Sequence, residues 1–143
     1  MLEKLISNAT ASGEPLPHVL LLGGEPQTRM AVATFLAHQC RADFRIASDI
    51  SRKTSAGMAS QFIGLKHGIL FLDALEKLTA EVEDVLRSAL INGNVLIKIE
   101  EWGVVRQQEI ELSPFTLVAT TSHERIISPD LLQLFQIQLH VGV

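Results

Sequence analysis

The sequence predicts an α/β domain of three layers, in which helices cover both faces of a mostly parallel β-sheet. Val19–Leu22 and Ile69–Leu72 are continuous apolar runs, as in strands buried on both faces, and helical segments separate the successive strand candidates. We therefore expect Ile69–Asp73 to be a central strand that lies beside Val19–Leu22. Asp73 is then at the carboxyl edge of the sheet, where open α/β sheets bind their ligands.

Length and composition indicate one domain, spanning residues 1–143. The 143 residues are 47% hydrophobic, enough for a substantial core, and carry a net charge of −4, which argues against direct DNA binding. The single cysteine, Cys40, excludes an internal disulfide and fits a reducing compartment. Neither a membrane-spanning run nor a signal-peptide pattern is present, so we expect a cytoplasmic protein without membrane contact.

The helix candidates are apolar or amphipathic segments between turn signals. Leu2, Leu5 and Ile6 share one side of a short N-terminal helix, which a linker to residue 15 follows. Thr79 is a candidate N-cap of the most amphipathic segment, and Gly93 follows as its stop signal. The other predicted helices cover 28–40, 79–92 and 129–134, with one more that contains Met58 and Phe62 and ends at Gly64 or His67. The predicted strands of the sheet cover 19–22, 44–47, 69–73, 115–121 and 136–141.

A change to a period of two after Gly93 predicts an inserted β-hairpin, with strands at 95–99 and 109–112. Trp102 lies near its tip beside Val104 and Val105, so these three residues are candidates for contact with a partner protein. The alternative is that Trp102 folds back onto its own sheet.

Four stretches in order carry a resemblance to a known family: HVLLLGGEPQTRMA, GILFLDALEKLTAEVEDVL, EIELSPFTLVATTS and SPDLLQLF. They resemble the large domain of AAA+ ATPases, and most of all the RuvB family of Holliday-junction motors, over residues 16–141. The resemblance implies a P-loop NTPase-like fold with a five-stranded parallel sheet. RuvB proteins continue into a helical lid and a winged helix, and we expect this chain to hold the core domain without either.

The phosphate loop of the family follows the pattern GxxxxGK[ST], and this chain departs from it. Over Gly23 to Met30 it has Thr28 for the second glycine, Arg29 for the lysine and Met30 for the hydroxyl residue that binds Mg²⁺. A thioether is a poor ligand for this hard cation. Either Arg29 is a substitute cation or the loop is a turn without a ligand, and we predict the second.

The other catalytic motifs are also incomplete. Asp73 matches the family's metal-ordering acid, but Ala74 stands where the family has the general-base glutamate. Thr121 matches a polar sensor, and the arginine-finger segment 129–135 contains no arginine; Arg125, just upstream, is interpreted as a surface residue. The vestigial nucleotide-binding set is therefore Gly23, Gly24, Thr28, Arg29, Asp73 and Thr121, with no catalytic residue and no metal ligand.

Two functions are compatible with this pattern. The first is a non-catalytic RuvB-like domain without a cofactor, which is not an enzyme and serves as an interaction or structural module for a protein partner, such as an active AAA+ subunit, a second copy or a DNA-processing complex. The alternative is an ATP/Mg-binding protein or weak ATPase of the RuvB type in DNA recombination and repair. The partner's identity and the oligomeric state stay open.

Overall fold

A five-stranded parallel sheet forms the centre of the molecule in the computed structural model, which describes residues 16–47, 54–123 and 126–141. Its strand order is β2-β3-β6-β1-β7, and every neighbouring pair is parallel. The strands are β1 (Val19–Leu22), β2 (Phe44–Ala47), β3 (Ile69–Leu72), β6 (Thr116–Thr121) and β7 (Ile137–His140). The parallel sheet confirms the predicted fold class.

The prediction that the two apolar strands lie side by side is wrong. β1 and β3 are interior and parallel, as expected, but β6 lies between them: Phe71 pairs with Val118, which in turn pairs with Val19. All six residues of β6 are buried. An apolar run on both faces identifies an interior strand but carries no information about which interior strand is its neighbour.

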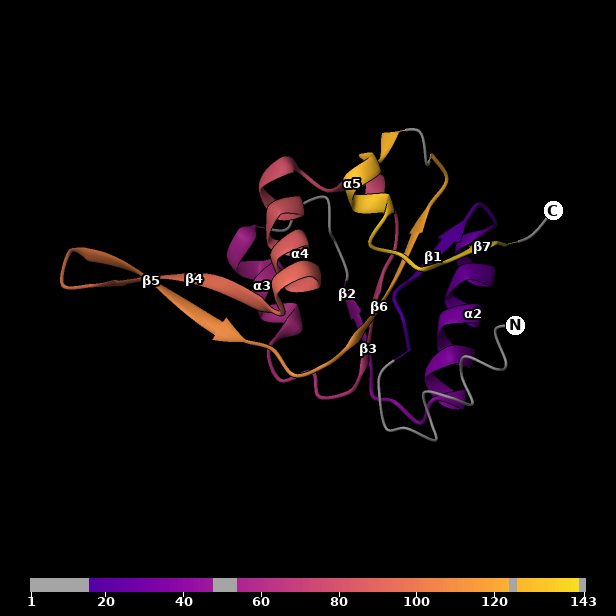
Figure 1. The fold of residues 1–143 in the computed structure, drawn as a ribbon, viewed down its shortest axis with the longest axis horizontal. Coiled ribbons are helices and arrows are strands. Elements are labelled where there is room, and N and C mark those ends of the chain that lie inside the picture. Colours follow the sequence, from indigo (N-terminus) through magenta and orange to yellow (C-terminus); the bar gives the residue numbers. More distant parts are fainter. Residues whose placement is uncertain (1–15, 48–53, 124–125, 142–143) are drawn as a thin grey trace.

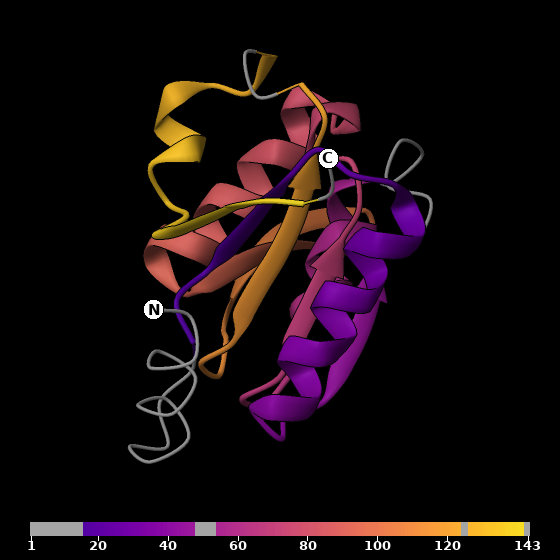
Figure 2. The same ribbon diagram turned by 90° about the vertical axis from the view of Figure 1, so that its right-hand side faces the viewer.

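Helices cover the two faces unequally (Figures 1 and 2). Helix α2 (Pro26–Gln39) covers one face, and α3 (Ser55–Phe62), α4 (Ala80–Asn92) and α5 (Pro129–Leu132) lie on the other. A short 3₁₀-helix, η2 (Leu75–Lys77), follows β3. Successive side chains of β6 alternate between these two layers, so the domain has the predicted three-layer arrangement.

Local chemistry explains the helix boundaries. Thr79 caps α4 by accepting a hydrogen bond from the Val82 amide, and Gly93 ends it at a φ of 70°, as predicted. Helix α2 begins earlier than expected, because Pro26 is suited to the first helical turn. Helix α3 ends earlier than expected, at Phe62, because the next residue is extended and Gly64 has a φ of 80°.

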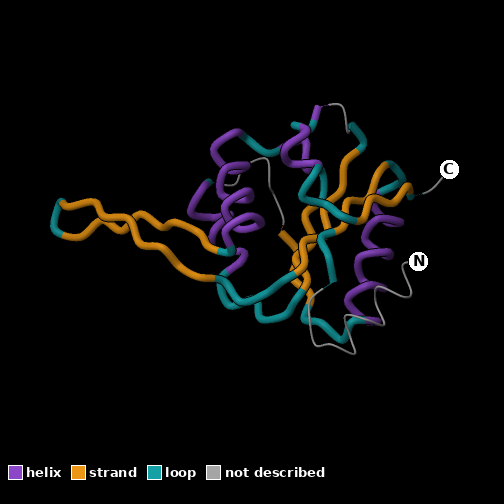
Figure 3. The backbone as a smooth tube through the Cα atoms, viewed as in Figure 1, coloured by secondary structure: helices purple, strands orange, loops and turns teal. Residues whose placement is uncertain are grey.

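The inserted hairpin projects from the rest of the domain (Figure 3). Its strands β4 (Asn94–Glu101) and β5 (Val104–Glu111) pair without interruption, which makes them longer than the predicted segments. Trp102 and Gly103 form the two-residue turn, with φ values of 54° and 78°. Positive φ at both positions is what a type I′ hairpin turn requires.

Some predictions concern parts of the chain outside the described residues. They are the N-terminal helix with its linker, over residues 1–15, and the surface position of Arg125. Within the described ranges, no helix combines the length and the apolar character needed to cross a membrane.

His18 gives the fold a predicted pH dependence. Its Nδ1 accepts a hydrogen bond of 2.9 Å from the Leu117 amide, and burial lowers its pKa from 6.5 to about 4. Between these two values the unfolded chain binds a proton that the folded protein does not, so stability falls as the pH drops from 6.5 towards 4, by on the order of 3 kcal/mol in total.

Urea unfolding of the wild type and of His18→Asn, measured between pH 7 and pH 5, tests this expectation. The asparagine can accept the same amide hydrogen bond but does not titrate, so its stability should vary less over this interval. His38→Asn, at an exposed histidine, should retain the full pH dependence of the wild type. Equal slopes for the two variants would contradict the assignment to His18.

Candidate nucleotide site at the carboxyl edge of the sheet

The loop between β1 and α2 is held tightly at the carboxyl edge of the sheet. Gly23 and Gly24 have φ values of 74° and 77°, and the Gly23 amide donates a 3.0 Å hydrogen bond to the Thr121 carbonyl. A Cβ added at Gly24 would lie 2.8 Å from the carbonyl oxygen of Val141. Both the left-handed backbone and the lack of space therefore require glycine at position 24.

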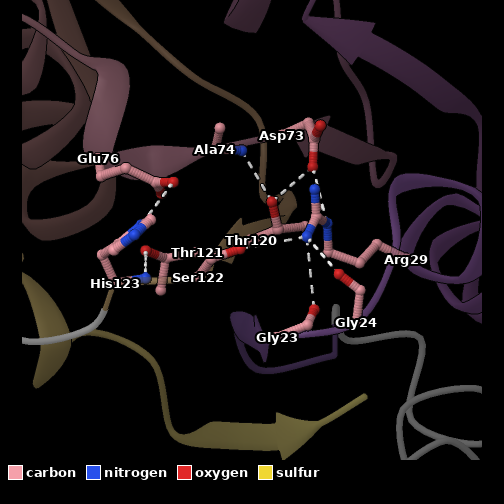
Figure 4. A network of polar contacts seen from close by, with 10 residues as sticks. All are labelled: Gly23, Gly24, Arg29, Asp73, Ala74, Glu76, Thr120, Thr121, Ser122 and His123. Atoms are coloured by element: carbon pink, nitrogen blue, oxygen red, sulfur yellow. Dashed lines mark hydrogen bonds and ion pairs between the residues drawn. The ribbon is translucent and has the colours of Figure 1, made fainter. Parts of the chain in front are cut away.

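Arg29, on the first turn of α2, folds back into this loop (Figure 4). Its Nε donates to Asp73 Oδ1 at 3.1 Å, and its Nη1 donates to the Gly24 carbonyl at 2.9 Å. Weaker contacts of 3.5 Å join Nη1 to the Gly23 carbonyl and to Ser122 Oγ. The Arg29 side chain is only 8% exposed, so the guanidinium fills the space between the loop and the end of β3.

In these contacts the loop presents carbonyl acceptors to the Arg29 side chain. A phosphate loop binds its ligand through converging N–H donors, whereas here the Gly23 and Gly24 carbonyl oxygens face a cation. The same cation neutralises Asp73, the acid at the metal-ordering position. Arg29, Asp73 and the Gly24 carbonyl thus form one connected group of polar contacts.

Thr120 completes the group around Asp73. Its hydroxyl donates to Asp73 Oδ1 at 2.6 Å and accepts from the Ala74 amide at 2.7 Å. Ala74 has left-handed backbone angles, φ 65° and ψ 69°, which are uncommon for a residue with a Cβ. The backbone turn after β3 is thus fixed by a hydroxyl from the neighbouring strand.

The sequence interpretation selected Thr121 and missed Thr120. Thr121 Oγ1 accepts from the His123 amide at 3.0 Å on the opposite side of β6, so its role as a sensor stays a prediction. The alternation of side chains along a strand could have identified Thr120. Residues two apart lie on the same face, so Asp73 shares a face with Phe71, and Thr120 shares one with Val118. Phe71 and Val118 both pack on the side of α2.

A second polar group, Glu76 and His123, lies on that opposite side (Figure 4). Glu76 Oε2 is 3.6 Å from His123 Nδ1. Burial by itself raises the pKa of Glu76, but the nearby Thr121 hydroxyl and His123 more than offset this, so the pKa lies below its usual value. The acid is held in its ionised form by neighbours of its own, and the sequence interpretation did not single it out.

The predicted nucleotide set is therefore only partly assembled. Gly23, Gly24, Arg29 and Asp73 meet at one point, whereas Thr28 lines a separate apolar groove between α2 and β7. The described residues include no cluster of three or more His, Cys, Asp or Glu side chains that could hold a metal ion.

Two further predicted regions, the arginine-finger segment and the hairpin tip, contribute no residue to the loop. Within the arginine-finger segment, Leu131 and Phe135 are buried in the core. Trp102, Val104 and Val105 are 99%, 65% and 60% exposed at the hairpin tip, far from the loop. The alternative in which Trp102 packs back onto its own sheet is therefore excluded.

Comparisons with known proteins agree with this architecture. A family model described as the P-loop domain of the Holliday junction DNA helicase RuvB matches residues 1–141. The RuvB subunit of the Holliday junction branch migration complex from Staphylococcus haemolyticus is 31% identical over 141 residues, covering 98% of this chain and 43% of the relative. The corresponding subunit from Fervidobacterium nodosum is 28% identical over 135 residues, covering 94% of this chain and 39% of the relative.

Solved structures show the same relationship. A mutant of RuvB from Thermotoga maritima superposes with a TM-score of 0.83 at 27% identity, covering 99% of this chain and 44% of the other. The chain thus spans less than half the length of these relatives. Because the family model matches nearly all of its residues and the sheet, loop and hairpin take the expected places, this chain belongs to the RuvB family of AAA+ proteins.

Proposed function

We propose that this chain is a non-catalytic RuvB-like AAA+ domain that serves as an interaction or structural module. The observation that carries the proposal is the position of Arg29, which bonds both the Asp73 carboxylate and the Gly24 carbonyl. A nucleotide phosphate would have to displace the guanidinium and would then meet carbonyl oxygens. The loop therefore has a structural role in tying β1, β3 and α2 together.

Among the residues that the structure describes, those near Asp73 also lack a group suited to activate water. Ala74 has no titratable side chain, and the next acid along the chain, Glu76, points towards Thr121 and His123. A general base must reach the proton that it abstracts, within about 3 Å or through one water. This supports the absence of hydrolysis even if a nucleotide were to bind.

Nucleotide titration tests the proposal directly. We expect neither a thermal shift nor heat of binding at millimolar Mg-ATP or Mg-ADP, and no hydrolysis above background. Ala74→Glu alone should restore no activity because the loop would remain occupied. A full-length active RuvB, measured in parallel, is the positive control. A micromolar dissociation constant for this chain would contradict the proposal.

One observation favours the alternative, an ATP-binding protein or weak ATPase of the RuvB type in DNA recombination and repair. Helix α2 begins at the loop without a side-chain cap from Glu25, so its first amides are available to an anion at the positive end of the helix dipole. In this alternative Arg29 swings out to the phosphates and frees Asp73 for Mg²⁺. Arg29→Ala should then abolish a measurable affinity for ATP, whereas our proposal predicts no affinity to abolish.

The hairpin tip is the proposed contact with a partner protein. Trp102 is fully exposed at a position of positive φ, where a type I′ turn favours asparagine. An aromatic residue placed there at a conformational cost is better explained by binding than by stability. The resemblance to RuvB, whose hairpin engages a junction-binding partner, supports a protein of the branch-migration machinery as that partner.

The charges of the hairpin support a protein over DNA at this surface. The hairpin strands carry four glutamates, of which two precede the tip and two lie on the other strand. They carry only two basic side chains. The glutamates are Glu100, Glu101, Glu109 and Glu111, and the basic residues are Lys98 and Arg106. Acidic side chains repel the phosphate backbone that supplies most of the affinity for DNA. An exposed aromatic residue with a charged surround is instead typical of a protein-binding anchor.

A further inference from the structure

A pocket lies at the amino edge of the sheet, away from the loop that holds Arg29. It has a volume of about 480 Å³ and is lined by residues that precede β1, β6 and β7, by α4 and by the segment after α5. Pockets of roughly 300–1,000 Å³ are typical of small-molecule sites. The lining residues include Leu16, His18, Leu90, Phe115, Gln133 and Gln136.

The base of the pocket is apolar and contains two rings. Leu16 and Phe115 are 3% and 8% exposed. The imidazole of His18 lies beside the Phe115 ring, with the two centroids 5.4 Å apart and the planes tilted by 40°. Leu90 of α4 adds an aliphatic side chain. Because aromatic rings favour offset or tilted contact with a further ring, this base is suited to a planar aromatic ligand.

His18 also supplies a hydrogen-bond donor. Its Nδ1 accepts a 2.9 Å hydrogen bond from the Leu117 amide, so the neutral ring carries its proton on Nε2. Among the described residues, none accepts a hydrogen bond from Nε2, and the enclosed side-chain atoms without a partner are Glu76 Oε1 and Arg87 Nε. Nε2 is therefore accessible, and a ligand in the pocket meets an N–H group that needs an acceptor.

The other polar groups of the pocket are uncharged. Gln133 and Gln136 are exposed at its mouth, and each carboxamide can both donate and accept hydrogen bonds. The described residues that line the pocket include no Asp, Glu, Lys or Arg. Burial lowers the pKa of His18 to about 4, so its imidazole is neutral at physiological pH. A charged ligand would lose hydration here without gaining an opposite charge.

We propose that this pocket binds an uncharged aromatic compound that carries a carboxamide group. The ring of the ligand packs against His18 and Phe115, and its amide carbonyl accepts a hydrogen bond from His18 Nε2. The amide nitrogen donates to the side-chain oxygen of Gln133 or Gln136. The site does not depend on whether the chain binds nucleotide, because His18 precedes β1 whereas the phosphate loop follows that strand.

Titration of the full chain with three ligands of similar size, followed by amide-resolved NMR, tests the ligand class. Benzamide has the ring and the carboxamide, benzoate replaces the amide by a charged carboxylate, and toluene has no polar group. We expect saturable shifts at the amides of Phe115, Leu117 and Gln136, with benzamide binding about tenfold more tightly than benzoate or toluene. Absent or unsaturable shifts, or equal affinities for the three compounds, would overturn the proposal.

The imidazole of His18 provides a second measurement in the same titration. Nitrogen NMR of the ring should show Nε2 protonated in the free protein. Its resonance should shift when benzamide binds and stay in place with toluene, because only benzamide brings an acceptor to Nε2. An Nε2 resonance that does not move at saturating benzamide would contradict the proposed contact.

Variants at the mouth of the pocket test the amide contact without touching the core. The double variant Gln133→Ala and Gln136→Ala should weaken benzamide binding about fivefold, as for the loss of one hydrogen bond, and leave the affinity for toluene unchanged. Gln107→Ala, at an exposed glutamine of the hairpin, should bind benzamide as the wild type does. If the double variant bound benzamide as tightly as Gln107→Ala, the carboxamide would have no partner at the mouth and the proposal would fail.

Discussion

Arg29→Ala should lower the free energy of unfolding by about 2 kcal/mol, because it leaves the Gly24 carbonyl and the Asp73 carboxylate without their partner. Loss of a fully buried ion pair costs more, but Asp73 is 40% exposed and can be rehydrated. Urea unfolding followed by far-UV circular dichroism, at neutral pH and without nucleotide, measures the change.

Two further variants make this result specific. Arg29→Lys keeps the charge but loses the forked geometry that reaches two acceptors at once, so its stability should lie between those of the wild type and Arg29→Ala. Lys77→Ala removes an exposed cation of η2 and should stay within about 0.5 kcal/mol of the wild type. If Arg29→Ala were as stable as Lys77→Ala, the guanidinium would have no structural role in the loop.

Trp102→Ala should weaken association with a branch-migration partner by about 30-fold, as expected for the loss of an aromatic hot spot worth roughly 2 kcal/mol. Folding stability should not change, because the side chain is 99% exposed. The measurement is a binding titration against the junction-binding subunit that works with RuvB in the same host, at fixed salt concentration.

The controls separate contact from hairpin integrity. Trp102→Asn supplies the residue that the type I′ turn prefers, so it should keep the hairpin intact and still lose binding. Ile126→Ala removes another exposed apolar side chain, away from the hairpin, and should bind as the wild type does. Undiminished binding by Trp102→Asn would refute the tip as the anchor.

The strands and their parallel arrangement were predictable, because a strand buried on both faces requires a continuous apolar run. Val19–Leu22 and Ile69–Leu72 are such runs. Strand order was not, since hydrophobicity does not identify the partner across a hydrogen-bonded edge. The full length of β5 was also missed. Both faces of the hairpin are exposed here, so Arg106, Gln107 and Gln108 show no alternation of apolar and polar residues.

The site shows a similar division. The substitutions at Arg29 and Ala74 are visible in the sequence, and they indicated that the phosphate loop is altered. That Arg29 turns inward, and that Thr120 holds Asp73, depends on side-chain direction at the meeting point of three strands. Periodicity could have placed Thr120 on the correct face, but only tertiary packing determines the direction of a long, flexible arginine side chain.

The exposed position of Trp102 also determines what the intrinsic fluorescence of this protein can measure. The chain has one tryptophan and no tyrosine, so its ultraviolet emission comes almost entirely from the hairpin tip. Since that indole is in water before and after unfolding, its emission wavelength carries little information about the stability of the sheet. A blue shift of the same emission would instead report the arrival of an apolar surface at the tip, so the protein has a built-in fluorophore for binding and none for folding.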